Sequence, residues 1–216
     1  MRQMLTAAAC LAAVLPLAWI AANTLTSPAR GKEPRFPQLT LDQLNDQQRP
    51  VGEKIAKISS VGLGGPYNPM LRSPVYAQRM YDLLDYLRWH TSVPTTLNEM
   101  AILVVSRQWR SQVEWYAHAP KKAGLAESII ADLKANKQPT DMSAEEAVVY
   151  DFVTDLTTKH AVSDALFDRA KMLLGEQQVV DLTAVAGTYV GVAMLLAMAE
   201  QGVPADKEPP FRDGEP

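Results

Sequence analysis

The stretch PTTLNEMAILVVSRQWRSQVEWYAHAPKKAGL, residues 94–125, decides the fold class because it contains two helical segments separated by a short turn. Pro94 and the threonines after it are typical of a helix start, and the apolar run from Met100 to Val105 predicts a helix buried on most sides. The residues WRS then predict a tight turn before the second helix. Two helices joined so briefly pack antiparallel, side by side.

Three side chains of this helix pair are suited to acid–base chemistry. Glu99 lies on the first helix, and Glu114 and His118 lie one turn apart on one face of the second. If the three converge, the carboxylates favour a protonated imidazole while burial opposes charge on every group, which can give a proton donor and acceptor near neutral pH. The alternative for Glu114 is structural, because Ser111 followed three residues later by Glu114 also forms a capping-box pattern.

The rest of the chain repeats the helical spacing and shows no alternating strand pattern with hairpin turns, so the predicted fold class is all-α. Ser143 with Glu146 three residues later predicts a second capping box. Ser163 and Gly175 stand where the start and the end of a further helix are expected.

The last expected helix, about residues 176–200, is apolar almost all round. A membrane span would have to accommodate Asp181 and Glu200, and its many small residues also suit close helix packing. We therefore expect a central buried helix that also lines a subunit contact.

The N-terminal residues have the order of an export signal: Arg2, an apolar run from Met4 to Ala22, and then the polar stretch NTLTSPARGKEP. Residues 1–22 are predicted to be a signal peptide or, alternatively, an uncleaved membrane anchor. Either form places the main domain outside the cytoplasm, as a periplasmic or secreted protein. The other predicted parts are a Pro-rich linker (23–50), a helical domain (51–203) and an extended tail (204–216).

Several kinds of site are disfavoured by composition and pattern. The one cysteine, Cys10, lies inside the predicted signal, so the mature chain has no thiol for disulfides, thiolate metal sites or nucleophilic catalysis. The net charge of −3, with scattered Lys and Arg, argues against nucleic-acid binding. Glu99, Glu114 and His118 could ligate a divalent ion, but no second histidine shares their face, so no metal is predicted.

Two further motifs contain residues capable of chemistry, Ser111 and the loop 62–74. Ser111 lacks the setting of a serine nucleophile and is better explained as a helix cap. The loop GLGGPYNPMLRSP, residues 62–74, lacks the Lys-Ser/Thr ending of a phosphate-binding loop. With Tyr67, Asn68 and Arg72 it could instead form the roof of a pocket.

The segments GGPYNPMLRSP, DYLRWHTSVPTTLNEMAILVVSRQWRSQVEWYAHAPKKAGL, GTYVGVAMLLA and GVP together resemble the carboxymuconolactone decarboxylase family of the alkylhydroperoxidase D-like superfamily, over about residues 50–205. In the peroxidase branch of that superfamily a Glu is followed by a Cys-x-x-Cys pair and a His. Glu99 and His118 keep the spacing of nineteen residues, whereas Ser111 and Glu114 occupy the two cysteine positions. Neither residue can cycle through a disulfide, so the resemblance implies the cysteine-free branch and not a thiol peroxidase.

The resemblance implies an alkylhydroperoxidase D-like helical bundle that assembles as a homo-oligomer, a trimer or a hexamer. It also implies a cofactor-free lyase, decarboxylase or isomerase for a small unsaturated carboxylic acid or lactone. The predicted export is a departure, because decarboxylation of aromatic-pathway lactones is cytoplasmic metabolism. The alternative is a non-catalytic oligomeric protein that keeps the pocket for binding a small molecule.

Roles for individual residues follow from the same resemblance. His118 would be the acid, with Glu114 or Glu99 orienting and tuning it. Arg107 or Arg72 would hold a substrate carboxylate. The candidate pocket walls are Tyr67, Trp115 and Tyr189.

Overall fold

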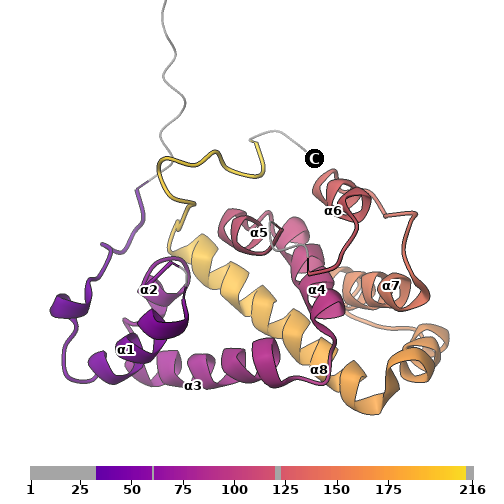
Figure 1. The fold of residues 1–216 in the computed structure, drawn as a ribbon, viewed down its shortest axis with the longest axis horizontal. Coiled ribbons are helices and arrows are strands. Elements are labelled where there is room, and N and C mark those ends of the chain that lie inside the picture. The colour runs from indigo at the N-terminus through magenta and orange to yellow at the C-terminus, as the bar shows by residue number, and fades with distance from the viewer. Residues whose placement is uncertain (1–32, 60, 120–122, 213–216) are drawn as a thin grey trace, which may run out of the picture. The chain divides into compact units, whose positions relative to one another are not determined.

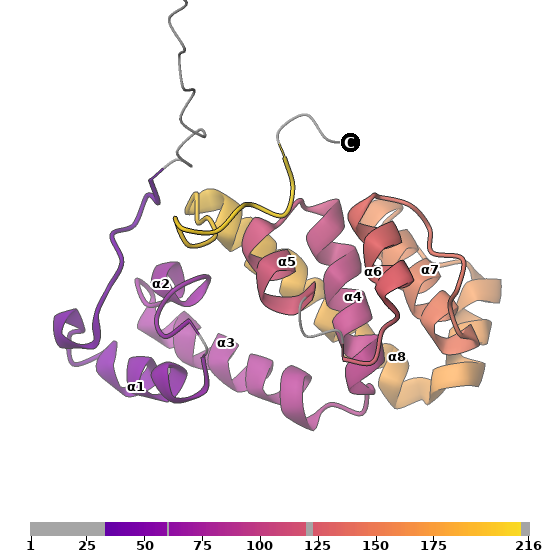
Figure 2. The same ribbon diagram turned by 45° about the horizontal axis from the view of Figure 1, so that its top comes forward.

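Helix α4 (Thr95–Gln108) contains the apolar run of the opening stretch, and every residue from Leu97 to Arg107 is buried. It packs against α5 (Gln112–His118), α7 (Ala144–Thr158) and α8 (Asp164–Met198), as Figures 1 and 2 show from two directions. A helix without a polar face can be stable in water only when other helices surround it. The position of α4 therefore follows from its composition.

The structure is a computed structural model that describes residues 33–59, 61–119 and 123–212, which belong to the unit Gly31–Pro216. Over these ranges the chain forms helices and no strands, which confirms the all-α class. The remaining elements are η1 (Leu41–Gln43), α1 (Arg49–Ile58), α2 (Tyr67–Met70), α3 (Pro74–Asp85), the π-helical turn η2 (Tyr86–His90) and α6 (Glu127–Lys134).

Two apolar clusters form the core, and α8 contributes to both. The larger one surrounds α4 and includes Phe152 of α7 and Leu182 of α8. The smaller one joins α1 and α2 to the C-terminal part of α8, where Val192 and Leu196 are buried. Helix α8 thus holds the two parts of the fold together.

The long helix α8 changes direction at Gly175, whose φ of 78° lies in the left-handed region that favours glycine. The expected break at Gly175 is therefore present. By length and composition α8 could cross a membrane, but half of its most apolar window is buried inside this unit. The helix is a core element here, as predicted.

The predicted caps of α7 and α8 are both formed. Ser143 accepts a hydrogen bond from the Glu146 backbone while the Glu146 side chain accepts one from the Ser143 N–H, which completes the capping box. The Ser163 side chain accepts from the backbone N–H of Leu166.

The part of the expected linker that the structure describes is not a free tether. The Arg35 N–H donates to the Ala199 carbonyl (2.9 Å), and Asn68 of α2 bonds both Phe36 O (3.1 Å) and Leu39 N (3.1 Å). Leu44 is buried. The linker prediction is corrected for these residues because the Asn68 amide satisfies their backbone groups; residues 1–22, with the predicted signal, lie outside the described residues.

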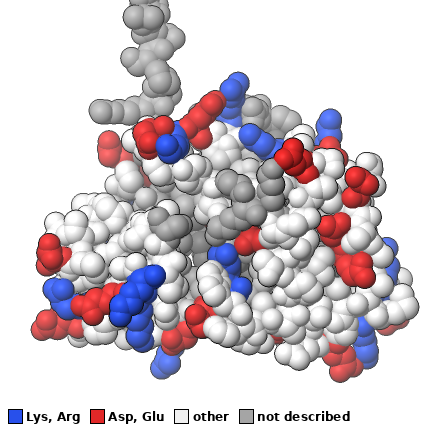
Figure 3. Space-filling model, in the orientation of Figure 1, with Lys and Arg blue, Asp and Glu red and all other residues white. Residues whose placement is uncertain are grey.

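The expected tail is extended but docked. Phe211 is buried, its ring meets the Trp115 ring edge-on with centroids 5.2 Å apart, and its backbone exchanges two hydrogen bonds with the Gln112 side chain (2.7 and 2.9 Å). The tail is therefore part of the fold. On the face shown in Figure 3, acidic and basic side chains are interspersed among neutral ones.

Candidate functional site

The turn between α4 and α5 brings the acid–base residues together. Arg110 adopts a left-handed conformation (φ 48°), and the Ser111 N–H bonds back to Ser106 O (2.8 Å), which ends α4 and reverses the chain. Glu99 and His118, nineteen residues apart, then face one another with Glu99 Oε2 2.6 Å from His118 Nδ1. Both side chains are about 95% buried.

A third group, the partly buried Arg88, holds the other oxygen of Glu99. Its Nη2 donates to Glu99 Oε1 (3.1 Å) and its Nη1 donates to the Tyr189 hydroxyl (3.3 Å). Arg88 stabilises the charged form of the Glu99 carboxylate, which accepts a hydrogen bond from Nδ1–H of the imidazole. Nε2 of His118 then faces Tyr189 and not a carboxylate. The pair therefore fixes the orientation of the His118 ring.

Arg88 was not among the residues predicted from the sequence. The residue lies on η2, the π-helical turn that continues α3, and π-helical turns are frequent at functional sites. A signal was present, because Met80, Leu84 and Arg88 repeat every four residues on the inner stripe of one helix. A charge at such a position indicates a buried partner.

Tyr189 of α8 faces the imidazole. Its hydroxyl lies 3.4 Å from His118 Nε2, and the two rings meet edge-on with centroids 5.3 Å apart. Burial raises the pKa of Tyr189, and the charges of Glu99 and Glu114 act in the same direction against the opposing Arg88. Tyr189 was predicted as a pocket wall, and its contact with His118 places it inside the acid–base cluster.

Glu114 is buried but differs from Glu99. No capping bond joins it to Ser111, and neither of its oxygens forms a hydrogen bond with another described residue. Burial raises the pKa of Glu114 to about 8; the nearby Ser111 hydroxyl acts to lower it, although the two groups do not meet in hydrogen-bond geometry. The capping-box alternative for Glu114 is therefore wrong in this structure, and the carboxyl is neutral near pH 7.

The other predicted substrate-binding residues lie in different places. Tyr67 is mostly buried, and burial raises its pKa. The positive charge of Arg88 is near enough to act in the opposite direction, but its effect is smaller. Trp115 is a core residue that packs against Phe211. Tyr67 thus borders the cluster, whereas Trp115 supports α5 from the side of the tail.

The observed contacts of Arg107 and Arg72, the two arginines predicted to hold a carboxylate, are with residues outside the acid–base cluster. Arg107 Nε donates to Lys134 O (2.9 Å) and its guanidinium lies over the Phe211 ring. Arg72 donates to Pro37 O and lies over the Phe36 ring. Their predicted role of holding a carboxylate fits Arg88 better, because Arg88 is the cation beside Glu99 and Tyr189.

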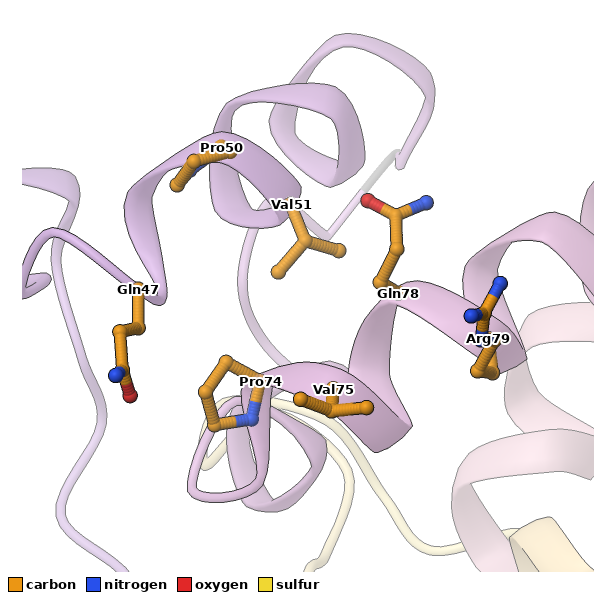
Figure 4. Close-up of a pocket in the computed structure, with 7 residues that line it drawn as sticks. All are labelled: Gln47, Pro50, Val51, Pro74, Val75, Gln78 and Arg79. Atoms are coloured by element: carbon orange, nitrogen blue, oxygen red, sulfur yellow. The ribbon is translucent and has the colours of Figure 1, made fainter.

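A separate hollow lies on the surface between α1 and α3, with a volume of about 470 Å³ (Figure 4). Val51 and Val75 line its apolar part, and Gln78 and Arg79 stand at its edge. None of its lining residues belongs to the buried cluster, so the acid–base groups and not this hollow define the candidate site. Over the described ranges, no group of three His, Cys, Asp or Glu side chains is placed to hold a metal ion.

The described part of the chain has an alkylhydroperoxidase D-like fold. A similar solved structure is that of an uncharacterized peroxidase-related protein from Ralstonia eutropha JMP134, described as an alkylhydroperoxidase AhpD core. The match has a TM-score of 0.66 and 14% sequence identity, and it covers 78% of this chain and 90% of the other. Neither the protein-family models nor the curated proteins gave a match. The comparison establishes the fold.

Proposed function

We propose that the protein is a cofactor-free acid–base enzyme that moves a proton at a carbon next to a carbonyl group. Its reaction would be that of a lyase, decarboxylase or isomerase acting on a small unsaturated carboxylic acid or lactone. The observation that supports this proposal is the buried Glu99–His118 pair at 2.6 Å, with Arg88 fixing the carboxylate. Such a pair gives a histidine one defined proton-accepting nitrogen in a dry environment.

Each residue of the cluster has a task in this reaction. His118 Nε2 takes the proton from carbon and returns it, while Glu99 stabilises the imidazolium that forms in between. Arg88 can hold a substrate carboxylate, since a guanidinium has five N–H groups and two of its bonds are accounted for by Glu99 and Tyr189. The 3.4 Å contact of Tyr189 with Nε2 is long for a hydrogen bond, so a substrate can displace it.

The test is the replacement His118→Gln, with His160→Gln at the exposed end of α7 as the matched control. We expect the first variant to lose about 10²–10⁴-fold in turnover. Turnover is measured as deuterium uptake at carbon by NMR, with a panel of small unsaturated carboxylic acids and lactones. His160→Gln should keep wild-type turnover, and both variants should keep their helical circular dichroism. Full activity of folded His118→Gln would contradict the proposed role.

A non-catalytic binding protein is the second candidate, and the strong burial of the cluster favours it. The side chains of His118 and Glu99 are each only about 5% exposed. Such deep burial suits a protein that retains its ligand better than an enzyme that exchanges substrate and product rapidly. This candidate predicts that His118→Gln leaves ligand affinity intact and that no panel compound exchanges deuterium. A thiol peroxidase has less support, because Ser111 and Glu114 cannot form a disulfide.

Export remains part of the proposal. The apolar run from Met4 to Ala22 supports either a cleaved signal or an anchor. N-terminal mass analysis of the protein recovered from the cell envelope and from the medium distinguishes the two, and recovery from the cytoplasm alone would contradict export.

A further inference from the structure

The start of α5, with its N-cap residue Ser111, holds three buried polar atoms that have no hydrogen bond with any other described residue: the Ser111 hydroxyl oxygen and both Glu114 carboxyl oxygens. Ser111 is 7% exposed and Glu114 is 3% exposed. Burying such groups without a partner is unfavourable, so structures normally supply one. These atoms point to a partner that is not part of the described chain.

The two carboxyl groups near His118 have separate roles. Glu99 is engaged on both oxygens, by Arg88 and by His118. Glu114 takes no part in those bonds, although it lies close enough to Tyr189 to affect its ionisation. Glu99 therefore orients the imidazole, and Glu114 is available to the ligand.

The environment determines what Glu114 offers a ligand. Ser111 stands at the N-cap before its helix, His118 lies one turn further along α5, and Tyr189 of α8 is close enough for the two groups to affect one another's ionisation. Its burial leaves it protonated near neutral pH, with a pKa of about 8. It then presents an O–H donor, as the Ser111 hydroxyl can.

We infer that Glu114 and Ser111 form an oxyanion subsite, which donates hydrogen bonds to the carbonyl oxygen of a small carbonyl compound as its enolate develops. The inference rests on the proposed function and specifies its substrate class. A neutral carboxylic acid in an apolar site is a known means of stabilising an enolate. Donors fixed in advance where charge develops are among the strongest contributions to catalysis.

The electron balance of the step is simple. His118 Nε2 removes a proton from the carbon next to the carbonyl, the C–H electron pair becomes the C=C bond, and the C=O π pair moves to oxygen. That oxygen accepts hydrogen bonds from Glu114 and Ser111, and the imidazolium returns the proton to carbon. In a decarboxylation the C–CO₂ pair forms the C=C bond instead, CO₂ leaves, and protonated His118 supplies the proton.

The test uses 4-nitrophenol as an enolate mimic, because its bound phenolate is detected by absorbance without any turnover. Glu114→Leu removes the donor and should weaken phenolate binding near neutral pH by about 100-fold or more. Ser111→Ala should weaken it about tenfold, as loss of one weaker donor. The exposed Glu145→Gln is the control and should bind as the wild type does.

The pH dependence gives a second, independent readout. Wild-type binding of phenolate should fall about tenfold per pH unit above about 8, where Glu114 ionises and repels the anion. Glu114→Gln keeps an N–H donor without titrating, so its binding should stay level over that range. This readout still decides the question if Glu114→Leu does not fold.

Three outcomes would overturn the inference: no phenolate binding by wild type, wild-type affinity in folded Glu114→Leu, or the same pH profile for wild type and Glu114→Gln. The His118→Gln variant separates this inference from the proposed function, since phenolate binding does not require proton transfer. Active His118→Gln with Glu114-dependent binding would reject the catalytic histidine but keep the subsite.

Discussion

At the scale of single residues, burial makes the two carboxyl groups of the site chemically unequal. Glu99 is held by Arg88 and His118, which stabilise its charge. Glu114 is bonded to no cation among the described residues, and its pKa is raised to about 8 by burial. A pair of carboxyl groups whose environments favour opposite protonation states is how proteins divide the work of acid and base. In the proposed reaction, this division gives orientation of His118 to Glu99 and hydrogen-bond donation to Glu114.

The raised pKa of Glu114 predicts how stability depends on pH. Between about 4.5 and about 8 the folded protein holds a proton that the unfolded chain releases, so stability falls as pH rises through this window. The contribution is about 1.4 kcal/mol per pH unit. Glu114→Gln removes it, so its stability advantage over wild type should grow with pH and then level off above about 8. Urea unfolding from pH 5 to 9 measures the difference, and parallel curves would contradict the assignment.

Arg88 gives a second prediction at this scale. Arg88→Met leaves Glu99 buried with His118 as its observed partner, which should cost about 3 kcal/mol of unfolding free energy and most of the activity. Arg88→Lys restores the charge and should recover part of the stability. The control is Arg169→Met, which breaks a surface ion pair with Asp151 and should cost less than about 1 kcal/mol. Equal losses in the two Met variants would show that Arg88 is only a surface group.

Part of the site could be predicted from the sequence, and whether a residue could be placed depended on its local pattern. Glu99 and His118 could be paired because two helices and a short turn fix their separation. The orientation of Glu114 could not be predicted, because one pattern fits both a cap and a buried acid, and only packing around α5 decides. Arg107 and Arg72 were chosen for their charge, but the carbonyls of Lys134 and Pro37 bind them elsewhere.

At the scale of elements, the connection after α3 fixes the position of Arg88. Asp181 of α8 accepts hydrogen bonds from the Tyr86 hydroxyl, the Thr91 hydroxyl and both the N–H and hydroxyl of Ser92. Burial alone would raise the pKa of Asp181, but these bonds outweigh it and hold the pKa below its usual value. The two ends of η2 are thereby tied to α8, the helix that also carries Tyr189.

The docked tail leads to a prediction for α5. Phe211 supports Trp115, next in sequence to Glu114, and Phe211→Ala should cost about 3 kcal/mol by opening a cavity beside that ring. The same variant should change the tryptophan fluorescence of the native protein. Phe167→Ala, at a half-exposed position of α8, is the matched control and should cost much less. Wild-type stability of Phe211→Ala would mean that the tail does not hold α5.

At the scale of the whole chain, the all-α class and the longer helices followed from periodicity and caps, but the short helices α2 and α6 and the packing of the flanking segments did not. Pro-rich segments with few apolar residues are typical of linkers. Here single apolar anchors, Leu44 before α1 and Phe211 after α8, act together with hydrogen bonds from Asn68 and Gln112 to hold such segments against the core. Isolated anchors leave no periodic pattern, so a sequence analysis based on periodicity misses them.

The outer stripe of α8 bears on the proposed homo-oligomer. Val180, Gly187, Met194 and Met198 follow one another at helical spacing and are exposed, and a Cβ at Gly187 would meet no atom within 4 Å. Small and apolar residues in such a row let another helix approach closely. We expect light scattering of the purified protein to give a trimer or hexamer of the 23.7 kDa chain.

The stripe can be tested against an equally apolar position on the same helix. Met194→Glu places a charge in the proposed contact and should shift the assembly to smaller species, because an unpaired charge is costly to bury. Met172→Glu changes a still more exposed methionine before the Gly175 break, so it should leave the mass unchanged. A monomeric wild type would contradict the oligomer, and an intact assembly in Met194→Glu would place the contact on another face. The acid–base cluster lies on the inner side of α8 at Tyr189, so both variants should still bind 4-nitrophenolate if each chain contains a complete site.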